Sequence, residues 1–172
     1  MHGHNFFELA YITGGTAEHT LETEVKTISA GDYFIVDYGC LHGFQNCKNL
    51  TLINCLFLPE TVDETLQGCR SFSQLLQGCL LKYYRMSLGK ARLARVSHDR
   101  DGQVGRLMQE MLLEYQEQKV GCYPLLRLKL LEILLLTLRG LIEPENERPY
   151  STSVQEVLEY VNGNYQESLK LG

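Results

Sequence analysis

The chain changes character at Pro59, and this break limits the fold more than any other feature of the sequence. Before Pro59, short segments rich in aromatic and β-branched residues alternate with turns that contain glycine or aspartate, a pattern typical of strands. After Pro59, apolar residues recur at the spacing of amphipathic helices. We therefore predict an α+β chain, in which short strands form a small barrel or sandwich and a helical region follows. The predicted strands are residues 6–13, 20–28, 33–36, 43–46 and 50–58.

The helical region is predicted to contain helices at residues 71–84, 101–118 and 123–141. In the second of these, the apolar residues Val104, Leu107, Met108, Met111, Leu112 and Tyr115 lie on one face that we expect to be buried. Gly121 is expected to end that helix. The helix at 123–141 has more apolar positions than one face needs, although its four charged residues argue against a membrane span. Because a small domain supplies only one covering layer, we predict that this helix forms a homodimer interface, with burial inside the domain as the alternative.

Composition excludes some classes of protein. The 172-residue chain has a formal net charge of -5, whereas a free-standing DNA-binding domain is expected to carry a basic face. Its six cysteines are scattered without a CxxC pair, and we find no signal peptide at its start. These features predict free thiols and a cytoplasmic protein that binds no membrane.

The C-terminal part of the sequence divides into two shorter pieces. Residues 143–152 are charged and contain proline, which is typical of a linker. Residues 153–172 begin with Ser153 and have Glu156 three positions later, which predicts a capping box and a further helix. The predicted organisation is therefore a β-domain at 1–59, a helical dimerisation region at 60–142, a linker at 143–152 and a separate segment at 153–172.

The candidate site begins at the first residues of the chain. His2, His4 and Glu8 have the same parity, so on one strand their side chains point to the same side. His42 lies on a later strand after a tight turn. Three imidazoles and one carboxylate are a suitable ligand set for a divalent transition metal such as Zn, Ni, Mn or Fe. The alternative is a metal-free polar pocket whose groups form hydrogen bonds with an organic effector.

Other polar and aromatic residues receive weaker assignments. Tyr11, Tyr33, Tyr38 and Phe44 are candidates for stacking on a sugar ring inside the barrel, with ordinary core packing as the alternative. His19 has odd parity and follows Gly14 and Gly15, so we expect it at the surface. His98 lies in a polar run that predicts an exposed loop, and we assign it no role. The candidate ligand-binding residues are His4, Glu8, Tyr11, Tyr33, Tyr38, His42 and Phe44.

Two stretches of the first half resemble the two motifs of the cupin superfamily. The first is His2-x-His4-x3-Glu8-x6-Gly15, and the second is Gly31-x5-Asp37-x-Gly39-x2-His42-x3-Asn46. The second departs from the cupin pattern only at Asp37, where the superfamily usually has proline. The glycine that opens the first motif has no counterpart, since Met1 directly precedes His2. The resemblance implies a cupin-like β-barrel, or double-stranded β-helix, which we expect to lack its usual first strands.

The order of the segments resembles one family in particular, the AraC-type transcription regulators. The stretches at 4–19 and 30–44 resemble the effector-binding domain of that family, and the helices that end near Leu136 resemble its dimerisation helices. Residues 154–169 resemble the first helix of its twin helix-turn-helix domain.

This resemblance implies a non-enzymatic regulator that senses a small polar molecule, of which carbohydrates are the expected class. Contact with DNA is expected only through a C-terminal domain of which this sequence holds the start. The alternative is a metal-dependent cupin enzyme of the isomerase or dioxygenase type.

Overall fold

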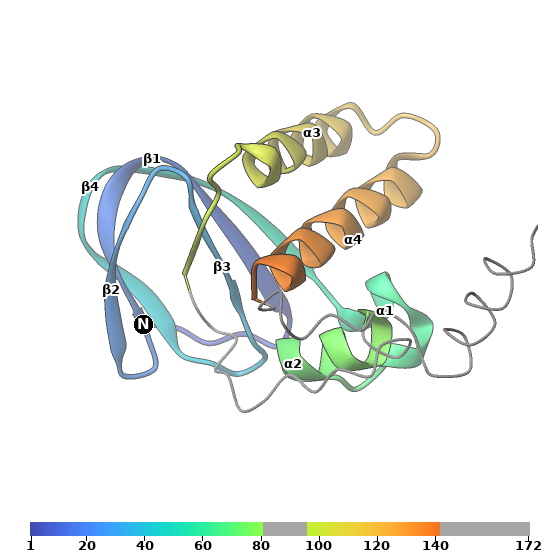
Figure 1. Ribbon diagram of the computed structural model, residues 1–172, viewed down its shortest axis with the longest axis horizontal. Helices are drawn as coiled ribbons and strands as arrows, with labels where there is room; N and C mark the ends of the chain where they lie inside the picture. The colour runs from blue at the N-terminus through green and yellow to red at the C-terminus, as the bar shows by residue number, and fades with distance from the viewer. Residues whose placement is uncertain (81–95, 142–172) are drawn as a thin grey trace, which may run out of the picture.

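A computed structural model describes residues 1–80 and 96–141 of the chain. It has two layers, a strongly curled antiparallel sheet and a pair of long helices that lie along one side of it (Figure 1). The strands are β1 (Phe7–Leu21), β2 (Glu24–Ser29), β3 (Asp32–Val36), β4 (His42–Phe57) and β5 (Ser97–His98). The long helices are α3 (Gln103–Glu117) and α4 (Cys122–Leu141), and the short helices are α1 (Pro59–Val62) and α2 (Phe72–Leu75). A 3-10 turn at Glu64–Leu66 and a π turn at Leu76–Leu80 adjoin the short helices.

The predicted α+β class is confirmed, and the predicted order of strands before Pro59 and helices after it holds except for the short β5. The predicted helix at 71–84 is realised over its described residues as α2 and the π turn, and its last residues lie outside the described part. The predicted linker at 143–152 and the predicted helix at 153–172 also lie outside the described residues.

Strand β1 organises the sheet, because it pairs antiparallel with β2, β3 and β4. β4 follows β1 along its whole length, from Phe7 opposite Phe57 to Leu21 opposite His42. Two strand predictions were wrong. Residues 20–28 form a hairpin that turns at Glu22, which has φ 53°, and a single strand, β4 (His42–Phe57), replaces the two predicted at 43–46 and 50–58.

The first strand was also predicted to end at Gly14 and Gly15, but β1 continues through both. Its pairing with β4 shifts register three times between Ile12 and Glu18, so the strand bends by bulges and does not stop. Gly15 has φ 73°, and a Cβ atom there would lie 2.2 Å from the carbonyl oxygen of Asn49. Glycine is therefore required at this bulge, because the backbones of β1 and β4 lie too close together there for a side chain.

The sheet separates two apolar clusters. The outer cluster lies between the sheet and the helices and includes Phe7, Leu9, Ile35, Met108 and Ile133. The inner cluster lies on the opposite face of the sheet and comprises Ala10, Ile12, Ala17, Ile28, Phe34 and Val36. Even-numbered residues of β1 face the inner cluster before the bulges and odd-numbered ones do so after them. This change of parity decides where the polar residues of β1 point.

The two long helices confirm their predicted positions. Val104, Leu107, Met108 and Met111 of α3 are buried as expected, but Leu112 and Tyr115 are 40% and 56% exposed. The helix ends at Glu117, because Gln118 takes a left-handed conformation with φ 47°, and Gly121 falls in the connection to α4. No helix among the described residues is long and apolar enough to cross a membrane.

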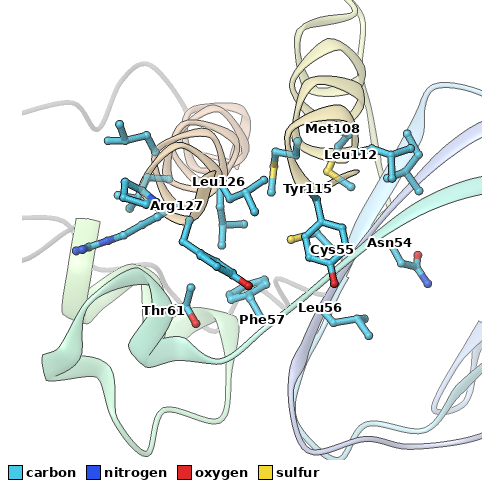
Figure 2. A pocket seen from close by; sticks show the side chains of 17 residues that line it. Asn54, Cys55, Leu56, Phe57, Thr61, Met108, Leu112, Tyr115, Leu126 and Arg127 are labelled. Carbon is cyan, nitrogen blue, oxygen red and sulfur yellow. The ribbon is translucent and has the colours of Figure 1, made fainter. Parts of the chain in front are cut away.

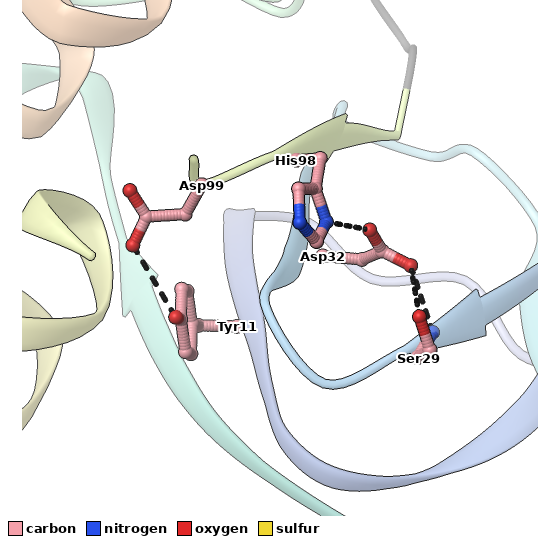
Figure 3. Close-up of polar contacts among 5 residues, drawn as sticks. All are labelled: Tyr11, Ser29, Asp32, His98 and Asp99. Carbon is pink, nitrogen blue, oxygen red and sulfur yellow. Dashed lines mark hydrogen bonds and ion pairs between the residues drawn. The ribbon is translucent and has the colours of Figure 1, made fainter. Parts of the chain in front are cut away.

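One polar contact fixes the start of α3 on the sheet. A carboxylate oxygen of Asp99 accepts hydrogen bonds from the Tyr11 hydroxyl at 3.3 Å and from the Gly105 amide at 2.8 Å (Figure 3). The tyrosine ring packs so closely that a Cβ atom at Gly105 would lie 2.3 Å from its oxygen. The site at residue 105 therefore accepts only glycine without movement of Tyr11.

We expect Gly105→Ala to lower the free energy of unfolding by about 1–3 kcal/mol, because the added methyl group overpacks this contact. The matched control is Gly140→Ala in α4, where a Cβ atom would meet nothing within 4 Å. The control is expected to be neutral or to stabilise by up to about 1 kcal/mol, since alanine favours a helix over glycine. Urea denaturation of both variants measures the difference. Equal stabilities for the two would show that the contact does not restrict residue 105.

Candidate functional site

The candidate site lies on the inner face, where the first residues of the chain meet the start of β4. His2 and His42 form an isolated antiparallel bridge, in which each amide donates to the other's carbonyl oxygen at 2.9 and 3.0 Å. The Gly39 amide donates to the carbonyl oxygen of His4 at 2.8 Å. These backbone contacts hold the two predicted motifs together. They bring His2, His4, Glu8 and His42 into one group, which we call the histidine cluster.

Glu8 lies at the centre of the histidine cluster. One of its carboxylate oxygens is 3.2 Å from Nε2 of His4 and 3.5 Å from Nε2 of His42. The side chains of His4 and Glu8 are each 5% exposed and that of His42 is fully buried, whereas His2 is exposed. Burial raises the pKa of Glu8, an effect that the nearby His4 and His2 partly offset.

The tautomer of His4 follows from its surroundings. Nδ1 of His4 lies 2.8 Å from the carbonyl oxygen of Phe6, which can only accept, so Nδ1 carries the proton. In the neutral ring the lone pair is then on Nε2, which faces Glu8. The Phe6 ring stacks parallel on His4 at 4.2 Å and holds this orientation.

Several buried ring nitrogens of this region have no hydrogen-bond partner among the described residues. They are Nε2 of His4, Nε2 of His19 and both nitrogens of His42. A buried polar atom left unpaired costs about 1–3 kcal/mol, so a bound ion or molecule that pairs with these nitrogens would gain that energy. Burial, together with His2, His19 and His4, lowers the pKa of His42 to about 4. His42 is therefore neutral at pH 7 and has a lone pair available.

Three residues of the histidine cluster also form a group that could hold a metal ion. Donor atoms of His2, Glu8 and His42 all lie within 4.8 Å of one another. Metal–ligand bonds of about 2.0–2.2 Å require neighbouring donors to lie within about 4.4 Å of each other, so a small inward movement would complete such a site. The donor set of imidazoles and one carboxylate suits the transition metals that the sequence analysis named.

The aromatic residues predicted to line the pocket divide between the two faces. Phe44 lies on the inner face, where its ring centroid is 6.2 Å from that of His42. Tyr11 and Tyr33 pack in the outer cluster against the helices, and Tyr38 packs edge-on against Phe7 of the same cluster. The expectation that these three tyrosines lie inside the barrel with Glu8 is therefore corrected. Odd positions of β1 before the bulges, and of β3, face the helices.

Two histidines lie where sequence analysis did not place them. His19, expected at the surface, is 3% exposed on the inner face, because the bulges reverse the parity of β1. His98, expected in an exposed loop, belongs to β5, which pairs with β3. Its Nδ1 lies 2.8 Å from a carboxylate oxygen of Asp32 (Figure 3). The side chain of His98 is nevertheless 59% exposed.

A groove lies on the outer face of the sheet, between the sheet and the long helices. This helix groove has a volume of about 910 Å³ and is bounded by α3, α4 and the end of β4 (Figure 2). Its walls are mostly apolar, with Met108, Leu112, Tyr115, Leu126 and Phe57 among them. It contains none of the buried unpaired nitrogens of the inner face.

The curled sheet, its buried polar cluster and the helices on its outer face define the class of small-molecule-binding domains with a cupin-like fold. The family model described as AraC-like ligand binding domain matches residues 1–135, and the chain belongs to this family. It is thus a regulatory ligand-binding domain of the kind that senses small molecules. A search of curated proteins found no significant match.

Proposed function

We propose that this chain is the sensing and dimerisation part of a cytoplasmic transcription regulator and that it binds a sugar or a similar polar metabolite at the histidine cluster. The observation that carries the proposal is the set of buried, unpaired imidazole nitrogens around Glu8. Hydroxyl groups both donate and accept hydrogen bonds, so they suit a site that combines imidazole nitrogens with a carboxyl group. No catalytic step is part of this proposal.

The effector-binding residues in this proposal are His4, Glu8, His42 and Phe44. Tyr11 lies on the outer face of the sheet, so in this proposal it does not touch the effector but links the sheet to the helices. Its contact with Asp99 joins the strand that carries Glu8 to the start of α3. A ligand can change the arrangement of sheet and helices only if it binds two arrangements with different affinity.

A thermal-shift screen tests the sensing proposal, because a ligand that binds only the folded state raises the melting temperature. The panel contains D-glucose, D-galactose, D-xylose and D-glucuronate. We expect at least one compound to raise the melting temperature of the wild type and to have little effect on Glu8→Gln, which keeps the size of the side chain. A panel without effect on the wild type, or with the same effect on Glu8→Gln, would contradict the proposal.

We further propose that a divalent transition metal such as Zn, Ni, Mn or Fe binds in the histidine cluster. His2, His4, Glu8 and His42 would hold it, with Nε2 of His4 already turned toward the carboxylate. A bound ion would act as a Lewis acid toward an oxygen of the effector. Glu8 would both hold the ion and accept hydrogen bonds from the effector through its second oxygen.

Dimerisation through α4 is the second part of the proposal. Leu125, Leu128 and Leu135 lie on one side of this helix and are exposed in the isolated chain by 38–61%. A row of large apolar side chains on one helix marks an interaction surface. Contact with DNA is proposed to occur only through a helix-turn-helix domain, whose first helix residues 153–172 resemble.

We expect Leu128→Lys to convert the dimer to a monomer, because it places a charge in the proposed apolar interface. The matched control is Val25→Lys in β2, since Val25 and Leu128 are 59% and 61% exposed. Sedimentation velocity over a range of concentrations measures the oligomeric state. If Leu128→Lys and Val25→Lys dimerise equally well, the interface does not involve this face of α4.

A further inference from the structure

His19 is a buried histidine that neither of the two motifs includes. It lies on β1 beyond the bulges and is 3% exposed. Its ring stacks on Phe34, with centroids 4.0 Å apart and an interplanar angle of 20°, and it contacts Phe44 at 5.2 Å. The two phenylalanines hold the imidazole in place, but neither of them can form a conventional hydrogen bond with it.

The ring of His19 also meets the histidine cluster. Its centroid is 5.8 Å from that of His42, and the two rings are nearly perpendicular. His19 does not belong to the group of His2, Glu8 and His42 whose donor atoms lie within 4.8 Å of one another. It is therefore placed beside the candidate metal ligands without being one of them.

Nε2 of His19 is buried and has no hydrogen-bond partner among the described residues. The rings in contact with that of His19 are those of Phe34, Phe44 and His42. Buried polar groups in proteins are nearly always paired, and a group that stays unpaired in the free protein is available to a ligand. A structural role would need only an apolar ring between Phe34 and Phe44.

We propose that His19 is a specificity-determining residue, whose Nε2 forms a hydrogen bond with a hydroxyl group of the effector bound beside His42. This inference rests on the proposed sensing function and names one group that recognises the effector. Because Phe34 and Phe44 offer no hydrogen bond, a ligand that lacks the hydroxyl would leave Nε2 unpaired. A site of this kind discriminates strongly against such analogues.

The test compares His19→Phe, which keeps an aromatic ring, with His19→Gln, which keeps a polar group near the position of Nε2. The same four sugars are titrated against each variant and the wild type by thermal shift. For a sugar that binds the wild type, we expect His19→Phe to raise the half-saturating concentration by about tenfold or more. His19→Gln is expected to recover part of the affinity. His98→Gln, at an exposed histidine, serves as the control that should bind like the wild type.

The stability of the ligand-free variants gives a second readout that needs no sugar. If Nε2 is kept unpaired for a ligand, His19→Phe should melt at the same temperature as the wild type or higher. A His19→Phe variant that melts lower while its sugar affinity is unchanged would show a structural role and overturn the inference.

The two proposals fail in different ways. If a sugar binds the wild type and Glu8→Gln loses it, but His19→Phe binds like the wild type, only the role of His19 is wrong. If no sugar binds the wild type, or if Glu8→Gln retains binding, the sensing proposal fails and the inference for His19 fails with it.

Discussion

Gly15→Ala is expected to lower the free energy of unfolding by about 3 kcal/mol or more. Two causes combine at this position. Gly15 has φ 73°, a conformation that costs an alanine about 1–2 kcal/mol, and the new Cβ atom would lie 2.2 Å from the carbonyl oxygen of Asn49. The oxygen belongs to the backbone of β4, so relief would require the two longest strands to separate.

Gly39→Ala separates these two causes. Gly39 has a similar φ of 71°, but a Cβ atom there would meet nothing within 4 Å. We expect the free energy of unfolding of this control to fall by only about 1–2 kcal/mol, which is the cost of placing an alanine at a positive φ. Urea denaturation of both variants gives the free energies of unfolding. Equal losses would show that the bulge adjusts to a side chain and that β1 and β4 do not need a close approach there.

Metal binding is expected to be lost in His42→Gln. The wild type, dialysed against Ni²⁺ in a weakly chelating buffer, is expected to keep about one ion per chain. His42 is fully buried and both its nitrogens lack hydrogen-bond partners among the described residues, so it can turn toward the ion without breaking a hydrogen bond to them. Its removal should weaken Ni²⁺ binding by about 100-fold or more, since loss of even an outer contact weakens metal sites by about 10–100-fold.

His98→Gln is the matched control for this measurement. His98 also pairs with a carboxylate, at 2.8 Å from Asp32, but it is exposed and belongs to no group of three donors among the described residues. Ni²⁺ content by mass spectrometry should be unchanged in this variant. If the wild type retains no Ni²⁺, or His42→Gln retains as much as the wild type, the histidine cluster is not a metal site. It would then serve the effector by hydrogen bonds alone.

Much of the fold could be predicted from local pattern. The break at Pro59, the strand at 33–36 and the two long helices follow from alternation and helical periodicity, which depend on neighbouring residues only. Parity on one strand predicted that His4 groups with Glu8, but β1 begins only at Phe7, so His4 precedes the strand. His42 was predicted to join them from its place after a tight turn. The β1–β4 pairing could not be derived in this way, because it joins residues up to 50 positions apart, Phe7 opposite Phe57.

The errors have one main physical cause. A glycine pair was taken as the end of a strand, whereas Gly14 and Gly15 lie within bulges that bend β1 and reverse its parity. That reversal carried His19 from an expected surface position to the inner face. Exposure of Leu112 and Tyr115 was missed because periodicity alone does not show where the neighbouring layer ends.

The central claim is that the ligand binds at the histidine cluster on the inner face and not in the helix groove on the outer face. NMR of protein labelled in its histidine rings and methionine methyl groups tests it, since Met108 and Met111 line the groove and His19 and His42 lie on the inner face. On addition of the sugar that gives the largest thermal shift, we expect the His19 and His42 ring signals to move more than the methyl signals of Met108 and Met111. Movement of the methionine signals with unchanged histidine signals would contradict the account.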